Sequence, residues 1–233
     1  MPDEHRNSET VRLIALTADD DQFFRMALRS ILARLGFQEV IETGSFDEAL
    51  EKLAEVENVS LALFDLQMPG LESPMNLRVV RENFPGTRVV VVSSSEHRHD
   101  IITALDAGVH GYVPKSLGPS DLSRALGLIL EGTIFVPISL ADLPTPEEET
   151  SHAQRPTLTA TNDSLSLTPR QRQVLELLVE GSSNKEIART LDLGEGTVKI
   201  HMAALFRNLG VANRAAAAVT GARIFSNKNH KQA

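Results

Sequence analysis

Short apolar runs alternate with amphipathic stretches through the first half of the chain. The apolar runs are continuous, which is typical of strands buried on both faces of a sheet, and they cover 12–18, 39–43, 60–66, 88–93 and 112–114. Apolar residues at helical spacing occupy 24–35, 45–53, 100–108 and 121–132, and Pro74 delays a further helix within 71–83. Five strands that alternate with five helices predict an α/β domain, in which helices cover both faces of a doubly wound, five-stranded parallel sheet.

The pattern changes at about residue 137. From there to residue 165 there is no periodicity, and four prolines, an acidic run at 147–149 and many Ser and Thr residues are typical of a flexible linker. After this segment the periodicity is only helical, with a capping box at 168–171 and further helices at 184–191, 195–209 and 213–225. We therefore predict an α/β domain at 11–136, a linker at 137–165 and a small all-α domain at 166–226.

Composition excludes several classes of protein. Hydrophobic residues make up 42% of the chain and charged residues 23%, as in ordinary globular proteins and unlike disordered ones. No apolar run approaches the roughly 20 residues that cross a bilayer, and the first residues lack the apolar stretch of a signal peptide. The absence of cysteine excludes disulfides, thiolate metal sites and cysteine nucleophiles. We expect a soluble, cytoplasmic protein.

The two parts of the chain differ in charge. Residues 1–165 carry 13 Lys and Arg against 26 Asp and Glu, whereas residues 166–233 carry 10 against 5, within an overall net charge of −8. A basic tail suits a polyanionic partner such as a nucleic acid. Chance clustering of surface charge is the alternative interpretation of this feature alone.

Polar side chains follow four of the five predicted strands. Chemistry in open α/β sheets gathers at the carboxyl ends of the strands, and the residues there are Asp19, Asp20, Asp65, Ser93 and Lys115. Neighbouring carboxylates repel one another, and a hard cation such as Mg²⁺ relieves that repulsion. Asp65 can attack phosphorus to form an acyl phosphate, while Lys115 and Ser93 can hold phosphoryl oxygens. Singly, each residue also fits a purely structural role, as a helix cap or a solvated charge.

Residues 11–135 resemble the receiver domain of bacterial two-component response regulators. The resemblance rests on the acid pair, Asp65 in LFDLQMPG, Ser93 after VVVV and Lys115 in AGVHGYVPKS. It implies a flavodoxin-like fold, Asp65 as the phosphoacceptor, Lys115 as a ligand of the phosphoryl group, and Ser93 and Tyr112 as the switch pair. It also implies Mg²⁺ as cofactor, held by Asp19, Asp20, Asp65 and the backbone carbonyl of Gln67. The chain departs from the family at Asp21, which adds a third acid, and at 71–74, where an acid and a glycine are usual.

The basic tail suits a helix-turn-helix. The predicted helix 195–209 carries Lys199, His201 and Arg207, and the short connection 192–194 joins it to the preceding helix. A helix fits the major groove, where its first turns meet base edges while other contacts hold phosphates. From charge alone, a solvated basic helix is an equally good interpretation.

Residues 166–223 closely resemble the LuxR/NarL-type helix-turn-helix. The resemblance implies that 195–209 is the recognition helix, that 184–186 start the supporting helix, and that the last helix dimerises the domain. It implies base-facing positions for Lys199, Ile200 and Ala203 and positions near the DNA backbone for Thr197, His201 and Arg207. Family members often have Glu, Ser, Asn and Lys where this chain has Gln171, Gly194, Ala204 and Asn208.

Together these features predict a DNA-binding transcriptional regulator rather than an enzyme. We expect a partner sensor histidine kinase to phosphorylate Asp65, and the active protein to bind double-stranded DNA as a homodimer. Two alternative functions remain open. An orphan regulator that works without phosphorylation is mildly favoured by the altered loop after Gly70, whereas the intact set of Asp19, Asp20, Asp65, Ser93 and Lys115 argues against it. An aspartyl-phosphate phosphatase of the haloacid-dehalogenase type is disfavoured because Gln67 stands where those enzymes carry a second Asp.

Overall fold

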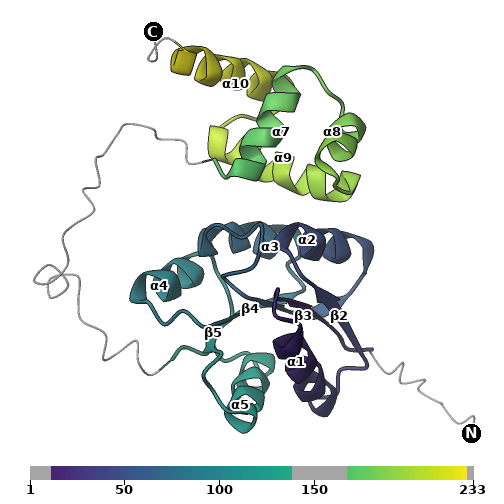
Figure 1. The fold of residues 1–233 in the computed structure, drawn as a ribbon, viewed down its shortest axis with the longest axis vertical. Helices are drawn as coiled ribbons and strands as arrows, with labels where there is room; N and C mark the ends of the chain where they lie inside the picture. The colour runs from purple at the N-terminus through teal and green to yellow at the C-terminus, as the bar shows by residue number, and fades with distance from the viewer. Residues whose placement is uncertain (1–11, 138–166, 230–233) are drawn as a thin grey trace, which may run out of the picture.

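A computed structural model describes residues 12–137 and 167–229, in two domains (Figure 1). The first domain is built on one parallel sheet in the order β2-β1-β3-β4-β5. The strands are β1 (Ile14–Ala18), β2 (Glu39–Thr43), β3 (Val59–Phe64), β4 (Arg88–Ser93) and β5 (Gly111–Pro114). The strand order reverses between β1 and β3, and ligands of open α/β sheets bind at such a point.

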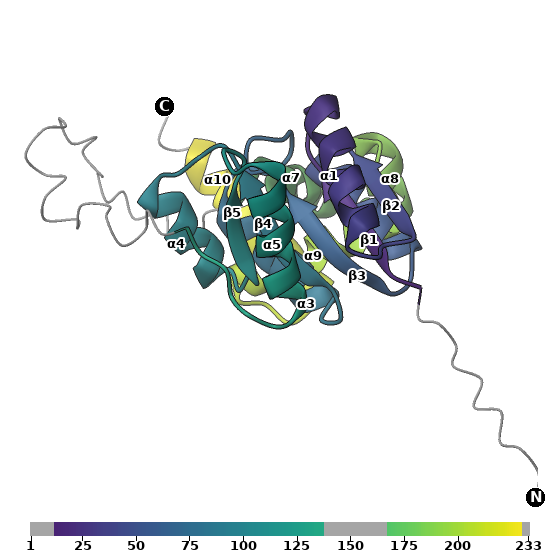
Figure 2. The same cartoon turned by 90° about the horizontal axis from the view of Figure 1, so that it is seen from below.

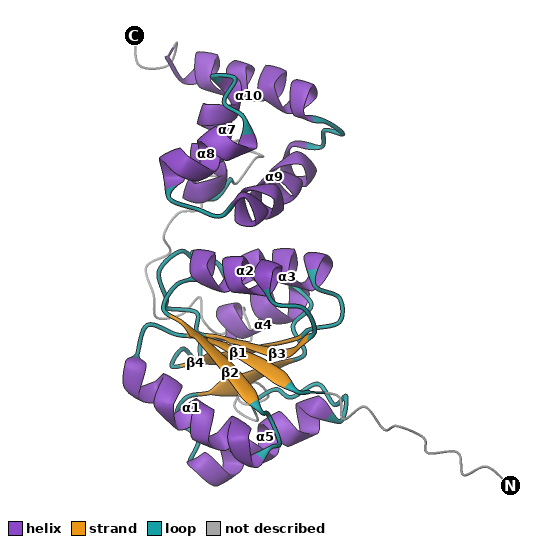
Figure 3. Cartoon of the chain, turned by 90° about the vertical axis from the view of Figure 1, so that its right-hand side faces the viewer, coloured by secondary structure: helices purple, strands orange, loops and turns teal. Residues whose placement is uncertain are grey.

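Helices cover both faces of the sheet, which confirms the predicted fold class. On one face lie α1 (Gln22–Arg34) and α5 (Pro119–Leu130), seen in front of the sheet in Figure 2. On the other lie α2 (Phe46–Glu55), α3 (Arg78–Asn83) and α4 (Arg98–Asp106), as Figure 3 shows from the side. The helix that Pro74 delays starts as a 3-10 turn, η1 (Pro74–Leu77), and continues as α3.

Local capping explains where several helices begin. The Asp21 carboxylate accepts hydrogen bonds from the backbone N–H groups of Phe23 and Phe24, which starts α1 directly after the acid pair. The Ser45 hydroxyl likewise accepts from the Glu48 N–H at the start of α2. Because the Asp21 cap directly follows the end of β1, it fixes the short loop that carries Asp19 and Asp20.

The second domain contains α7 (Pro169–Val179), α8 (Asn184–Leu191), α9 (Glu195–Leu209) and α10 (Arg214–Asn229). A capping box at Thr168 starts α7, as the sequence predicts, and a second capping box at Ser183 starts α8. Asp192 adopts a left-handed conformation (φ 55°), which ends α8 and turns the chain toward α9. Apolar side chains from all four helices form one core, among them Leu175, Ile187, Val198, Leu205 and Ala217.

The two domains are in contact. Helix α9 lies along α2 and α3 (Figures 1 and 3), and its side chains Ile200 and Ala204 join the hydrophobic cluster on that face of the sheet. The predicted linker, apart from Pro137, lies outside the described residues. Within residues 12–137 and 167–229, no helix combines the length and the apolar character needed to cross a membrane.

Candidate phosphoacceptor and DNA-binding sites

The acid pocket lies where β1 and β3 end side by side. Ala18 pairs with Phe64 in the parallel register, and the Asp65 N–H donates to the Ala18 carbonyl at 2.9 Å. Asp19 follows Ala18 and Asp65 follows Phe64, so this pairing brings the two aspartates together. Carboxylate oxygens of Asp19, Asp20 and Asp65 lie within 4.8 Å of one another. Asp19 and Asp65 are almost fully buried, whereas Asp20 is exposed.

Lys115, which follows β5, joins the two buried carboxylates. Its ammonium Nζ lies 2.8 Å from Asp19 Oδ2 and 3.1 Å from Asp65 Oδ2, and 4.7 Å above the centre of the Phe24 ring. Burial lowers the pKa of Lys115, but the bond to Asp19 and the nearby Asp65 outweigh it and raise that pKa. Burial of the Asp19 carboxylate raises its pKa, and the bond from Lys115 offsets this only in part.

The donor set fits a hard divalent cation. Lys115 contacts only Oδ2 of the Asp65 carboxylate. The other oxygen, Oδ1, is buried and has no hydrogen-bond partner in the part of the chain that the structure describes. A buried carboxylate oxygen without a partner is costly, and a cation bound there removes that cost. Asp20 offers an exposed carboxylate beside it. The predicted fourth ligand, the carbonyl of Gln67, belongs to the loop that leaves β3.

Ser93 and Tyr112 lie on the two neighbouring strands β4 and β5. Ser93 ends β4 and is fully buried, and its hydroxyl accepts from the Ser95 N–H at 3.2 Å. Tyr112, on β5, is also fully buried and donates its hydroxyl hydrogen to the Ser95 carbonyl at 2.6 Å. Burial raises the pKa of Tyr112 to about 12. The predicted switch pair therefore contacts one loop, the connection between β4 and α4.

The unusual loop after Gly70 is well anchored. Leu71 is buried, and Ser73 caps η1 by accepting from the Met75 N–H. The Pro69 carbonyl accepts from the Phe46 N–H at 2.9 Å, which ties the loop to the start of α2. The departure from the family pattern therefore leaves an ordered loop beside Asp65.

The predicted DNA-facing residues of α9 divide into two groups. Lys199, Ala203 and Arg207 are exposed. Thr197, Ile200 and His201 are buried, and the Thr197 hydroxyl finds no hydrogen-bond partner among the described residues. Ile200 packs with the hydrophobic cluster of the first domain. In this arrangement the receiver covers Ile200, one of the three predicted base-facing positions, while the other two, Lys199 and Ala203, are exposed.

Polar bonds join the domains beside this apolar contact. The Asp47 carboxylate, in the first turn of α2, accepts from Arg170 Nε at 2.8 Å and Nη2 at 2.6 Å. His201 Nε2 lies 3.0 Å from the other Asp47 oxygen. Burial raises the pKa of Asp47, but the bonds to His201 and Arg170 outweigh this and lower it. Arg207 forms an ion pair with Glu82 of α3.

Sequence reasoning missed Asp47, Arg170 and Glu82 as site residues. Asp47 and Arg170 are 123 residues apart, and each looks locally like an ordinary charge in the first turn of a helix. Sequence periodicity holds no signal for such a pairing. The acidic character of α2, with four carboxylates between residues 47 and 55, and the basic tail were the only available hints.

The approach of α9 to α2 is close because two glycines stand at the start of α9. A Cβ added to Gly196 would lie 3.3 Å from the Cβ of Ala54. One added to Gly194 would lie 2.6 Å from Glu51 Oε1. Gly194 occupies the cap position where family members often have Ser. The lack of a Cβ at these two positions therefore allows the start of α9 to pack closely against α2.

An α/β domain with a strand-end acid pocket, followed by a helix-turn-helix, is the plan of response regulators that act on transcription. Family models agree: the response regulator receiver domain matches residues 15–127, and bacterial regulatory proteins of the luxR family match residues 165–220. The chain is 33% identical to the glycerol metabolism activator of Pseudomonas putida over 213 residues, which is 90% of this chain and 95% of that protein. It is also 33% identical to the nitrate/nitrite response regulator NarL of Escherichia coli K12, over 88% of this chain and 92% of that protein.

The chain belongs to the NarL-type response regulators, which combine a receiver domain with a LuxR-type DNA-binding domain. Among solved structures it resembles RcsB of Salmonella enterica serovar Typhimurium bound to a promoter, with a TM-score of 0.52, 22% identity, and coverage of 91% of this chain and all of that one. That likeness supports the fold. The domain pair makes the chain a transcriptional response regulator, in a family of DNA-binding regulators rather than enzymes.

Proposed function

We propose that Asp65 accepts a phosphoryl group from a partner sensor histidine kinase and that this controls DNA binding by α9. The observation that carries the proposal is the Lys115 ammonium between Asp19 and Asp65, beside an Asp65 oxygen with no partner among the described residues. An Asp65 oxygen forms the new bond to phosphorus, and the bond from phosphorus to the kinase imidazole nitrogen breaks, leaving the imidazole as product.

The remaining pocket residues have defined roles in this step. Asp19, Asp20, Asp65 and the Gln67 carbonyl would hold Mg²⁺, which neutralises charge on the incoming phosphoryl group. Lys115 moves from the Asp65 carboxylate to a phosphoryl oxygen, since it is already within 3.1 Å of the reacting group. The Ser93 hydroxyl then donates to another phosphoryl oxygen.

The described arrangement fits the resting state. Ile200 and His201 of α9 are buried against the receiver, so DNA and the receiver compete for the same face of the helix. Phosphorylation shifts the population from joined to separated domains only by as much as the phosphoryl group stabilises the separated arrangement more than the joined one. Ser93 and Tyr112 connect the acid pocket to the loop before α4 and thus give the signal a path out of it.

The separated form acts as a homodimer on paired half-sites of double-stranded DNA. Val219 on α10 supports this, because a large apolar side chain that is 54% exposed is a candidate contact between two copies. Domain boundaries of 11–136, 137–165 and 166–226 remain the proposed division. A regulator that acts on DNA works in the cytoplasm, where bacterial DNA lies.

Mass spectrometry of the intact protein tests the first step. Acetyl phosphate with Mg²⁺ should add one phosphoryl group to the parent chain and none to Asp65→Asn. Asp20→Asn is the matched partial variant: it keeps the nucleophile and loses one metal ligand, so its phosphorylation should be slower but should reach one group. An unmodified parent would contradict the proposal and favour an orphan regulator. Continuous phosphate release would favour a phosphatase.

A further inference from the structure

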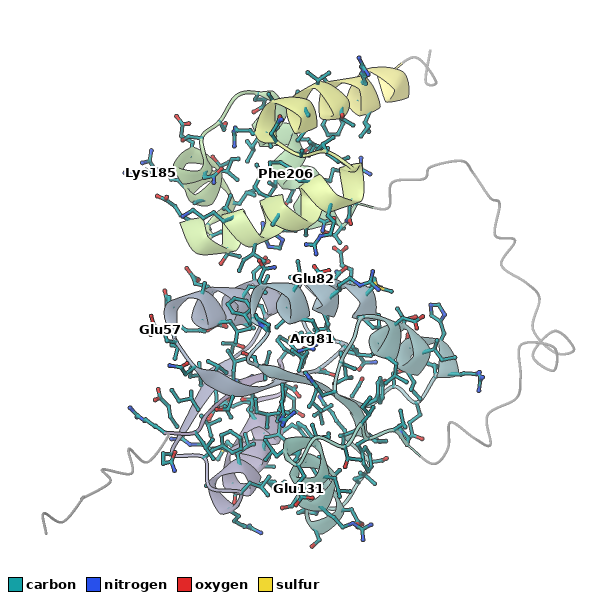
Figure 4. The ribbon with its side chains drawn as sticks, turned by 180° about the vertical axis from the view of Figure 1, so that it is seen from behind. Glu57, Arg81, Glu82, Glu131, Lys185 and Phe206 are labelled. Atoms are coloured by element: carbon teal, nitrogen blue, oxygen red, sulfur yellow. The ribbon has the colours of Figure 1, made fainter. Side chains whose placement is uncertain are left out.

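Carboxylates of the receiver face basic side chains of the DNA-binding domain across the contact between them. Asp47 contacts two nitrogens of Arg170 and one nitrogen of His201. Glu82, which is labelled in Figure 4, forms an ion pair with Arg207. His201 and Arg207 belong to the recognition helix. Asp47 and Glu82 of the receiver therefore pair with side chains that lie on the recognition helix or next to it.

We infer, on the basis of the proposed function, that Arg170 and His201 form a DNA phosphate site, and that Asp47 occupies the place of the phosphate while the domains are joined. Arg170 is thereby assigned as a DNA contact, which the sequence did not indicate. The receiver then holds the output domain by imitating its ligand.

The geometry of the Asp47 site supports this assignment. Arg170 directs its Nε and Nη2 at one oxygen, Asp47 Oδ2, at 2.8 and 2.6 Å, and a guanidinium held in this way can donate to a phosphate oxygen as well as to a carboxylate oxygen. His201 contacts the second oxygen from a different helix. An anion held by three nitrogens from two helices is more specifically bound than one in a surface ion pair.

The burial and the position of His201 and Arg170 favour a DNA phosphate as the anion that replaces Asp47. The side chain of His201 is only 7% exposed and that of Arg170 26%, so separating the domains exposes to water the nitrogens that contact Asp47, while Arg170 Nη1 keeps its bond to Gln173. Arg170 lies in the first turn of α7, where the helix dipole also favours an anion. His201 lies on α9 and Arg170 lies next to it, and a duplex that places base edges against Lys199 brings its own phosphates to this flank.

Full-length variants separate the two roles of Arg170. Asp47→Ala removes the carboxylate that occupies the place of the DNA phosphate and keeps Arg170 and His201. The test adds Arg170→Ala to that background, with Arg172→Ala in the same background as the control. Arg172 lies two residues further along α7, about 200° around the helix from Arg170. The probe is a short, fluorescently labelled duplex of mixed sequence, because phosphate contacts do not depend on sequence, and anisotropy is measured over a salt series.

Asp47→Ala should bind the duplex more tightly than the parent, without phosphorylation. Adding Arg170→Ala should reduce the slope of log affinity against log salt by about 0.9, which corresponds to a loss of about 15-fold at 50 mM salt and about fourfold at 200 mM. Arg172→Ala should leave the slope unchanged. Circular dichroism confirms that each variant is folded, and Asp47→Ala/His201→Gln should also bind more weakly than Asp47→Ala.

Equal slopes for the Arg170→Ala and Arg172→Ala backgrounds would overturn the phosphate site while leaving the DNA-binding function intact. An unchanged affinity of Asp47→Ala would overturn the competition between Asp47 and DNA. No DNA binding by any variant at low salt would instead contradict the proposed function itself, and the inference with it.

Discussion

Gly196→Ala is expected to improve the recognition helix and to loosen its contact with the receiver. Alanine in place of glycine within a helix contributes about 1 kcal/mol to helix stability. The added methyl group would lie 3.3 Å from the Cβ of Ala54, closer than the 3.5–4.0 Å at which carbon atoms attract one another. Because both atoms sit directly on helix backbones, α9 and α2 must move apart by a few tenths of an ångström.

The size of the effect follows from the contacts that this movement strains. Ile200 packs with the receiver core, and the Asp47 bonds to Arg170 have little slack at 2.6 and 2.8 Å. A cost of about 1 kcal/mol in the joined form shifts the balance toward separated domains about fivefold. The helix gain does not cancel this, because it applies equally to the joined and the separated forms.

The assay uses the absence of cysteine in this chain. Glu131→Cys at the far end of the receiver (Figure 4) and Arg223→Cys on α10 take spin labels at two defined points, and pulsed electron resonance reports the distance between the domains. Gly196→Ala should increase the long-distance fraction several-fold. Gly127→Ala is the control, since a Cβ there meets nothing within 4 Å. A distance distribution identical to that of the parent would refute the reasoning.

Three further predictions concern single side chains. Phe24→Leu removes the ring beneath the Lys115 ammonium, a contact of about 1 kcal/mol. Phosphorylation by acetyl phosphate, followed by intact mass, should therefore be about fivefold slower, and Phe24→Tyr should retain the rate of the parent. His110 Nδ1 accepts from the Val89 N–H, and burial lowers the His110 pKa. The unfolded chain then takes up the proton first, so the unfolding free energy should fall as the pH drops below about 6.5, measured by urea denaturation, and His110→Asn should weaken this dependence. Tyr112, the only tyrosine, should show phenolate absorbance half-developed near pH 12 when folded and near pH 10 when unfolded; a midpoint near 10 for folded protein would contradict its burial.

Features that depend on neighbouring residues were predictable from the sequence. Continuous apolar runs predicted the strands, because both faces of this sheet are covered by helices. The capping box at Thr168 marked the start of α7, because its hydrogen bonds join residues only three positions apart. The acid pocket was also predictable, since parallel strands bring their carboxyl ends to one edge of the sheet.

Features that depend on distant residues were not predictable. Asp47 and His201 are 154 residues apart, and no local pattern distinguishes Asp47 from the other acids of α2. The burial of Ile200 by the receiver was equally hidden, because an apolar residue on a recognition helix fits a contact with bases as well as one with protein. Only the packing of one domain on the other reveals what these residues contact.

The affinity of one protein sample for DNA, measured before and after phosphorylation, tests the central claim most directly. The probe is a DNA fragment that the protein retains from its own genome, and intact mass gives the phosphorylated fraction of the same sample. The account predicts an affinity at least about tenfold higher after phosphorylation, a change of about 1.4 kcal/mol, and no change for Asp65→Asn. Equal affinities for the unmodified and the fully phosphorylated parent chain would contradict it.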